Sequence, residues 1–338
     1  MELRPAGSAR PPLDAVLDAM RVVAIPTRTR FRGVTVREAA LFDAPLGASE
    51  FSPFPEYGDA EAAAWLAAAL DFGWREQPAL RRERIAVNAT VPAVPAAAVP
   101  GILARFPGCR TAKVKVAERG QTLAEDAARV GAVRAALGPD ALIRIDANGG
   151  WTVAEALAAL EALAPVGLDY AEQPCADVPG LAAVRLGLRA RGIPVRIAAD
   201  ESVRKAEDPL AVARAGAADL LVVKAQPLGG IGRALGIVAE AGLPVVVSSA
   251  LDTSVGIAMG LRLAAALPDG ALAGACGLGT AALLAGDVVA DPLLPVDGAI
   301  AVRRPALDPE RLERHRARPE REAWWRERVR RAYARLPA

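Results

Sequence analysis

The sequence contains almost no histidine and little cysteine. Its only histidine, His315, lies in the arginine-rich segment ERLERHRARPERE near the C-terminus. A Ser-His-Asp triad and a histidine-ligated metal are therefore nearly excluded, and a general base must come from Lys, Asp, Glu, Tyr or Cys. The cysteines Cys109, Cys175 and Cys276 are widely spaced and odd in number, so neither a disulfide framework nor a zinc knuckle is indicated.

Lysine is scarce as well. Of the 41 basic residues only four are lysines, at positions 113, 115, 205 and 224. Arginine retains its proton in proteins, whereas a buried amine can release one, so a retained lysine is a chemical candidate. Three of the lysines lie in the apolar, β-branched stretches AKVKV and LLVVKAQ. The simpler alternative is that these are strand-end lysines that extend to water.

Long apolar runs and a strong net charge are also missing. No apolar run reaches the roughly 20 residues that cross a bilayer, and MELRPAGSARPPLDAV contains no signal-peptide segment. The net charge of +2 gives no case for nucleic-acid or membrane binding. We expect a cytoplasmic protein that acts on a small molecule, with a monomer as a plausible state.

From about residue 85 onward, short β-rich runs alternate with segments of helical period, which is typical of parallel βαβ units. About 220 residues for eight such units suits a closed α/β barrel, which typically takes about 250. An open doubly wound sheet is the alternative, but no G-x-G-x-x-G turn follows the first strand. QPLGGIGRA (226–234) is interpreted as a tight βα loop. The predicted strands are 85–93, 111–118, 141–149, 168–174, 195–202, 220–227, 244–252 and, weakly, 274–280.

The first 84 residues predict a small α+β domain. Two strands joined by a polar loop are expected in 21–45, followed by a helix in 59–74. The tail after residue 302 predicts a further helix near 319–336, in which Trp324 and Trp325 either pack on the N-terminal domain or lie on a solvated amphipathic helix. We therefore divide the chain into residues 1–84, completed by 303–338, and a barrel at 85–302.

Polar residues fall at the C-terminal ends of successive predicted strands, where a barrel carries its chemistry. One βα unit separates each from the next, so all of them would reach one rim. They are Lys113 and Lys115, Asp146 and Asn148, Glu172, Asp200 and Glu201, and Lys224.

Three carboxylates from adjacent strands are costly together unless a cation binds between them. Oxygen ligands without histidine or cysteine favour Mg²⁺, with Mn²⁺ as a substitute, over calcium. Each carboxylate alone has the alternative of capping a helix or pairing with an arginine. Lysines beside the metal would have lowered pKa values, and a neutral amine can remove a proton next to a carboxylate while the metal stabilises the enediolate.

The motifs K-x-K, D-x-N, E-Q-P, D-E-S and K-x-Q on successive strands resemble the muconate lactonising subgroup of the enolase superfamily. The resemblance implies a modified (β/α)7β TIM-type barrel with an N-terminal α+β capping domain. It assigns the metal to Asp146, Glu172 and Asp200, acid/base roles to Lys115 and Lys224, and to Lys113 the lowering of the pKa of Lys115. The mandelate racemase branch needs a His–Asp dyad, which this chain cannot supply.

Within the subgroup, GASEFSPFPEY (47–57), VVSSALDTSVGIAMG (246–260) and GLGT (277–280) are similar to the o-succinylbenzoate synthase family. That resemblance implies syn dehydration of a cyclohexadiene carboxylate that carries a hydroxyl and a succinyl group, in menaquinone synthesis. It makes Ser248, Ser249, the backbone near Gly277, and Asn148 candidates for binding substrate. It also implies that TRTRFRG (27–33) is a loop that closes over substrate, with Arg28 or Arg30 reaching an anion. Ordinary loop capping for the serines and a plain surface hairpin for the arginines are the alternatives.

The nearest rival function is an N-succinylamino acid racemase, because two lysines on opposite faces also suit a two-base proton transfer. A dipeptide epimerase is less favoured, since no D-x-D pair lies on the eighth strand. A pyridoxal phosphate enzyme would leave the three carboxylates unexplained. A non-catalytic barrel that binds a metal or a partner would leave the lysines unexplained.

Overall fold

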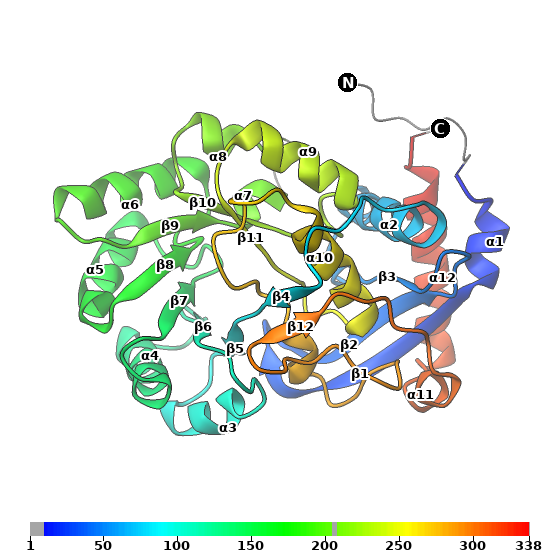
Figure 1. Cartoon of the computed structure of the whole chain (residues 1–338), viewed down its shortest axis with the longest axis horizontal. Helices are drawn as coiled ribbons and strands as arrows, with labels where there is room; N and C mark the ends of the chain where they lie inside the picture. The colour runs from blue at the N-terminus through cyan, green and yellow to red at the C-terminus, as the bar shows by residue number, and fades with distance from the viewer. Residues whose placement is uncertain (1–9, 205–207, 338) are drawn as a thin grey trace.

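The computed structural model describes residues 10–204 and 208–337. Lys205 and part of the N-terminal segment in which no signal peptide was predicted lie outside these residues. The chain forms a barrel and a smaller sheet-and-helix cap that packs against one side of it (Figure 1). In the described ranges, no helix is both long enough and apolar enough to cross a bilayer.

The barrel wall is a seven-stranded parallel sheet. Its β-branched and aliphatic strands are buried on both faces, as expected of parallel strands covered by helices. In spatial order the strands run β11-β10-β9-β8-β7-β6-β5. Their bounds are β5 (Ala89–Val91), β6 (Thr111–Lys115), β7 (Leu142–Asp146), β8 (Leu168–Glu172), β9 (Arg196–Ala199), β10 (Leu220–Val223) and β11 (Val245–Val247).

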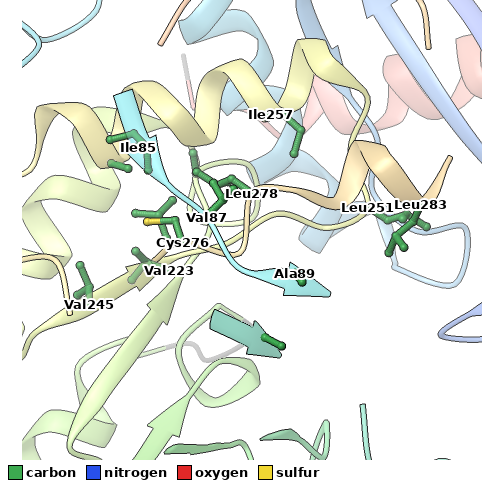
Figure 2. Close-up of a cluster of buried hydrophobic side chains, with 14 of the residues drawn as sticks. Ile85, Val87, Ala89, Val223, Val245, Leu251, Ile257, Cys276, Leu278 and Leu283 are labelled. Carbon is green, nitrogen blue, oxygen red and sulfur yellow. The ribbon is translucent and has the colours of Figure 1, made fainter. Parts of the chain in front are cut away.

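An irregular eighth segment closes the barrel. Parallel bridges join Val245 to Leu272 and Ser248 to Gly277 on one side, and Cys276 to Val87 on the other. Figure 2 shows Cys276 beside Val87 among the buried apolar side chains. The predicted closed α/β barrel is therefore confirmed and the open-sheet alternative is wrong. The weakly predicted strand at 274–280 forms only bridges, because its glycines interrupt the ladder.

The first predicted strand, 85–93, divides into two. β4 (Arg84–Ala86) pairs antiparallel with β12 (Ala299–Ala301), whereas β5 joins the barrel sheet. The chain between them carries Val87, which bridges to the closing segment. One run of β propensity thus serves two sheets, since pairing partners and not local preference decide where a strand ends.

Helices cover the outside of the barrel between the strands. Threonine side chains cap several of them; Thr122 and Thr152 each form a capping box with a glutamate three residues on. The glycine-rich stretch at 226–234 forms the predicted tight turn before α9, with Gly229 and Gly230 at positive φ. The helices are η1 (Ala96–Ala98), α3 (Val99–Leu103), α4 (Leu123–Leu137), α5 (Val153–Leu163), η2 (Ala164–Val166), α6 (Val178–Ala190), α7 (Glu201–Arg204), α8 (Ala211–Arg214), α9 (Ile231–Ala241), α10 (Ser254–Ala266) and η3 (Thr280–Leu283).

The cap is built from both ends of the chain. A three-stranded antiparallel sheet packs with helices α2 and α12, and Figure 1 shows the C-terminal helix beside α1 and α2. Trp325 on α12 is fully buried, donates to Glu38 Oε2 at 2.9 Å and meets the Phe51 ring edge-on, so the solvated-helix alternative is wrong. The elements are α1 (Leu13–Asp18), β1 (Met20–Phe31), β2 (Val34–Phe42), β3 (Ser49–Phe51), α2 (Asp59–Trp74), α11 (Pro309–Arg314) and α12 (Pro319–Ala334).

The polar stretch at 27–33 is the end of a β-hairpin, which was the stated alternative, and its closing over substrate remains a prediction. β1 continues through it to Phe31, and only Arg32 and Gly33 form the turn. Both turn residues have positive φ, 51° and 77°, which matches the twist of a two-residue hairpin. The hairpin carries the cap sheet toward the barrel rim.

Candidate active site

Six neighbouring barrel strands end at, or one residue before, a polar side chain. Lys115, Asp146 and Glu172 are the last residues of their strands, while the chain turns just before the other three polar residues. Because parallel strands end at the same rim, these side chains gather at one mouth of the barrel. The six are Lys115 (β6), Asp146 (β7), Glu172 (β8), Asp200 (after β9), Lys224 (after β10) and Ser248 (after β11).

Strand register places three of these residues in one row. Lys115 is the direct partner of Asp146, and Asp146 is the direct partner of Glu172. Lys113, two residues earlier on β6, faces the same side of its strand as Lys115. The like charges of the two lysines are therefore offset by carboxylates on the neighbouring strands.

Each carboxylate is paired with at least one lysine, and Asp146 also has Lys113 Nζ at 3.5 Å from its Oδ2. Lys113 Nζ lies 2.9 and 2.8 Å from the two carboxylate oxygens of Glu172, and Lys115 Nζ lies 2.5 Å from Asp146 Oδ2. Lys224 donates to Asp200 Oδ2. The carboxylates are at most 1% exposed and the lysines at most 7%. Ion pairs this deeply buried demand complete partnering, since removing one member leaves an uncompensated charge.

The pKa values of the carboxyl groups differ in direction. Burial raises that of Asp146, but the charges of Lys115 and Lys113 outweigh it and hold the pKa below its usual range. Asp200 behaves likewise, with Lys224 and Arg204 outweighing burial. For Glu172, burial and the negative charge of Asp146 prevail over Lys113 and raise the pKa to about 7. Burial is the largest cause of this rise, so Glu172 is the carboxyl group of the three that is hardest to keep ionised.

The three lysines also differ. Burial lowers the pKa of Lys115, and the charges of Lys113 and Arg32 lower it further against the attraction of Asp146. Burial likewise lowers the pKa of Lys224, against Asp200 and with Arg204. Burial lowers the pKa of Lys113 too, but Glu172 and Asp146 outweigh it, so its pKa is raised. The pKa values of Lys115 and Lys224 are thus lowered, whereas the raised pKa of Lys113 makes it a fixed cation.

A second layer of polar residues supports this row. Asn148, in the left-handed region at φ 47°, accepts from Lys115 Nζ at 2.6 Å and donates to Glu201 Oε1 at 3.2 Å. Arg204 binds both Asp200 Oδ1 at 3.0 Å and Glu201 Oε1 at 2.6 Å. One alternative prediction was that each carboxylate pairs with an arginine. This is true of Asp200, which pairs with Arg204 as well as with Lys224.

The carboxylates suit a divalent cation by donor chemistry. Three carboxylates at adjacent strand ends provide the all-oxygen ligands that Mg²⁺ binds. As the side chains stand, residues 10–204 and 208–337 contain no group of three His, Cys, Asp or Glu placed to hold an ion. The lysine ammonium groups bind the same carboxylate oxygens, so cation binding would require these ion pairs to open.

The tip of the cap hairpin reaches the mouth of the barrel. Phe31 and Arg32 line the cavity together with Lys115, and the Phe31 ring centroid lies 5.4 Å from Lys115 Nζ. Arg32 Nη2 is 3.7 Å from Glu201 Oε1. Arg28 is not brought to the cavity, because its Nε donates to the carbonyl of Leu284 at 2.9 Å. The left-handed turn directs Arg32, and not Arg28, toward the site.

The opposite wall of the cavity contains the predicted serines. Ser249 Oγ donates to the Gly277 carbonyl at 2.9 Å and lies 2.7 Å from Thr280 Oγ1. Ser248 Oγ approaches the same carbonyl at 3.4 Å. A Cβ at Gly277 would lie 2.6 Å from Ser248 Oγ, so only glycine permits this approach. The N–H of Gly277 is bonded to Val247 O, so among these groups the hydroxyls are the ones free to turn to a ligand.

Sequence reasoning did not single out several cavity residues. Phe31 and Arg32 lie within the segment TRTRFRG (27–33), but neither was named as a candidate. The Arg-Gly turn that follows Phe31 was the sequence feature that could have indicated them. Thr90 on β5 and Thr280 on η3 also line the cavity, as does Phe54 of the cap. Threonine and phenylalanine are common in strands and cores, so these residue types do not by themselves indicate a site.

Models of known families match both parts of the chain. The model described as Enolase C-terminal domain-like matches residues 102–307, and the model described as Enolase N-terminal domain-like matches residues 22–73. The predicted domain limits at 84 and 302 remain predictions, since a family match does not define where a domain ends.

Curated relatives match nearly the whole chain. The o-succinylbenzoate synthases of Mycobacterium tuberculosis and Mycobacterium bovis are each 56% identical over 96% of this chain and 97% of their own. That of Mycobacterium ulcerans is 56% identical over 95% of both.

Solved structures of more distant proteins show the same fold. The 2-chloromuconate cycloisomerase of Rhodococcus opacus superposes with a TM-score of 0.73 at 24% identity, covering 89% of this chain and 98% of its own. The N-succinyl Arg/Lys racemase of Bacillus cereus superposes with a TM-score of 0.71 at 19% identity, covering 88% and 97%.

Proposed function

This chain belongs to the enolase superfamily and within it to the o-succinylbenzoate synthases, and on that premise we propose how its site performs the reaction. It is a carbon–oxygen lyase that converts 2-succinyl-6-hydroxy-2,4-cyclohexadiene-1-carboxylate to 2-succinylbenzoate and water. The observation that carries the proposal is the row of Lys115, Asp146 and Glu172 across three strand ends, with Lys224 and Asp200 on the next two. That the product serves menaquinone synthesis is a further part of the proposal and rests on the family resemblance.

Lys115 is the base. Its buried amine has a lowered pKa, and it removes the proton from the ring carbon that bears the carboxylate. The electron pair of that C–H bond moves into the carboxylate to give an enediolate. The pair then returns to the ring, the C–OH bond breaks, and Lys115 gives its proton to the departing hydroxyl as water leaves. Formation of the aromatic ring favours this elimination.

Lys224 acts through its charge. Paired with Asp200 and fully within the barrel mouth, it stays protonated and stabilises the negative charge of the enediolate. Lys113, whose pKa is raised, adds fixed positive charge beside Lys115. The two lysines thus provide the preorganised electrostatic field, while Lys115 moves the proton.

Asp146, Glu172 and Asp200 are the residues that would hold Mg²⁺, or Mn²⁺ in its place. A divalent cation supplies Lewis-acid stabilisation of a carboxylate that is becoming an enediolate. Asn148 accepts a hydrogen bond from the amine of Lys115 and so orients the base. Ser248 and Ser249 line the same cavity, which supports the proposal that they bind the succinyl carboxylate.

The proposal is tested with purified protein and Mg²⁺ by following formation of succinylbenzoate from the cyclohexadiene substrate. A parallel assay in D₂O follows α-proton exchange with N-succinyl amino acids, and EDTA-treated protein is the control. Dehydration with little exchange supports the synthase. Exchange without dehydration would assign the same lysines to a racemase, and the absence of both reactions would remove the substrate assignment.

A further inference from the structure

A buried polar cluster joins the cap to the barrel beside the cavity. Arg37 comes from β2, Glu50 from β3, and Asp252 from the loop between β11 and α10. They are 2%, 0% and 4% exposed. Charged side chains are rarely buried this far unless they are paired, so the cluster requires an explanation. None of the three has a part in the chemistry described above.

Glu50 binds the N-terminal end of helix α10. Its Oε2 accepts from Thr253 N at 3.2 Å, from Thr253 Oγ1 at 2.5 Å and from Gly256 N at 3.0 Å. Its Oε1 accepts from Ser52 Oγ at 2.6 Å. The first N–H groups of a helix have no partner within the helix, and a carboxylate there also faces the positive end of the helix dipole. A cap residue some 200 positions away thus completes a barrel helix.

Gly256 makes this approach feasible. A Cβ at this position would lie 2.9 Å from Glu50 Cδ and 2.7 Å from Asp252 Cβ. Any larger residue would push the carboxylate of Glu50 away from the helix. The helix is therefore shaped to receive a side chain from the cap.

Arg37 holds the loop that precedes α10. Its Nε donates to the Leu251 carbonyl at 3.1 Å, its Nη2 donates to the Ser52 carbonyl, and Asp252 Oδ1 lies 3.9 Å away. Leu251 has a φ of 63°, in the left-handed region that branched side chains rarely adopt. Such a backbone persists only where its surroundings enforce it. Figure 2 shows the Leu251 side chain among the buried apolar residues with Leu283.

This loop begins at the cavity. Ser248, Ser249 and Ala250 line the cavity, and the residues that follow them are bound by the cap, Leu251 by Arg37 and Thr253 by Glu50. On the barrel side Ser249 is bonded to Gly277 and Thr280. The loop from 248 to 253 is thus held at one end by the barrel and at the other by the cap. Losing the cap contact would free residues 251–253, the half of the loop that directly follows the serines.

We propose that Glu50 is a positioning residue: from the cap, it holds helix α10 and the 248–253 loop so that Ser248 and Ser249 face the distal carboxylate of the substrate. The inference rests on the proposed function for the identity of that carboxylate. The contacts of Glu50 with the loop are independent of it. Glu50 therefore contributes to substrate binding and not to proton transfer.

The test compares Glu50→Met, which keeps length but removes both acceptor oxygens, with Glu50→Gln, which keeps one. Leaving Thr253 and Gly256 N–H groups unpaired should raise KM for the cyclohexadiene substrate by about tenfold or more, with kcat within about threefold. Glu50→Gln should stay near the wild-type KM, because the amide oxygen still accepts from α10. The control is Glu38→Met, which removes another cap carboxylate that binds only Arg321 and Trp325 of α12. It should lower the melting temperature without changing KM.

Hydrogen–deuterium exchange of the 248–256 amides supplies a readout that needs no substrate. Exchange should speed up in Glu50→Met but not in Glu50→Gln or Glu38→Met. Faster exchange with an unchanged KM would overturn the positioning role, as would equal KM changes in Glu50→Met and Glu38→Met. If wild-type protein exchanges as expected but lacks dehydratase activity, the proposed function fails and the loop contact stands.

A second pair of variants covers the case in which Glu50→Met does not fold. Thr253→Val removes the 2.5 Å hydroxyl bond to Glu50 on the barrel side and should raise KM in the same direction, by less. Ser52→Ala removes the 2.6 Å bond on the cap side and should leave KM unchanged. The reverse order of effects would contradict the proposal.

Discussion

Lys115 and Asp146 lie directly opposite each other at the ends of β6 and β7, with Nζ 2.5 Å from Oδ2. Their pairing follows from the register of two parallel strands and needs no loop to adjust it. Asp146 would therefore serve both as the partner of the proposed base and as a ligand of the proposed metal.

We first predict that the three carboxylates bind a divalent cation. EDTA treatment should abolish dehydration, and Mg²⁺ or Mn²⁺ should restore it. Bound Mn²⁺ can be measured by electron paramagnetic resonance without substrate, and Asp146→Asn should weaken it by more than about tenfold. The control variant Glu38→Asn removes a carboxylate of the cap and should bind Mn²⁺ as the wild type does. Equal Mn²⁺ binding in Asp146→Asn and wild type would disprove the assigned ligand.

We next predict that Lys115→Arg loses about 10³-fold in kcat, because arginine keeps the charge but cannot serve as a base. The matched variant is Lys113→Arg on the same strand face. Since Lys113 acts through its charge, this variant should retain far more activity than Lys115→Arg. Circular dichroism checks that both fold, and kcat is measured with saturating Mg²⁺. Comparable losses in the two variants would leave no separate role for Lys115 as the base.

Local patterns in the sequence were enough to predict the barrel and its row of polar residues. β-branched runs separated by helical segments predicted the strands, and the parallel architecture then brought their C-terminal ends to one rim. Lys115, Asp146 and Glu172 follow from strand order and register alone. This part of the site depends on contacts between consecutive βα units, which the sequence displays in order.

Contacts between distant segments could not be predicted in the same way. Glu50 binds Thr253, and Arg32 approaches Glu201, yet each pair is separated by well over 100 positions. The sequence named Arg28 and Arg30 and not Arg32, although Arg32 is the arginine that lines the cavity, at a two-residue turn with positive φ. The exact position of the turn thus determines which arginine reaches the cavity.

We predict that Arg32 contributes to substrate binding from the cap. Asparagine tolerates the left-handed backbone at this position, so Arg32→Asn removes the guanidinium with little backbone strain. Loss of a cation near a carboxylate substrate should lower kcat/KM by about tenfold or more. Arg28→Asn removes an arginine from the same hairpin that is bonded to Leu284, and it should leave kcat/KM unchanged. If Arg28→Asn lowers kcat/KM as much as Arg32→Asn does, the effect would come from the structure of the whole hairpin and not from the Arg32 guanidinium.

We finally predict that Glu50 makes the protein less stable as the pH rises toward neutrality. Burial and the charge of Asp252 raise the pKa of Glu50 from 4.5 to about 7, against hydrogen bonds from Ser52 and Thr253 and the charge of Arg37. Between these two values the folded protein holds a proton that the unfolded chain has released, so the free energy of unfolding falls with rising pH.

Glu50→Gln cannot titrate and should not share this loss. Its free energy of unfolding, relative to wild type, should increase from pH 5 to pH 8 by roughly 3 kcal/mol. Urea unfolding at several pH values measures the difference. Glu38→Gln is the control: Arg321 and Trp325 outweigh burial and lower the pKa of Glu38, so its difference from wild type should be flat above pH 5. A flat difference for Glu50→Gln would mean that Glu50 is ionised throughout, held as a carboxylate by Arg37 and the N-terminus of α10.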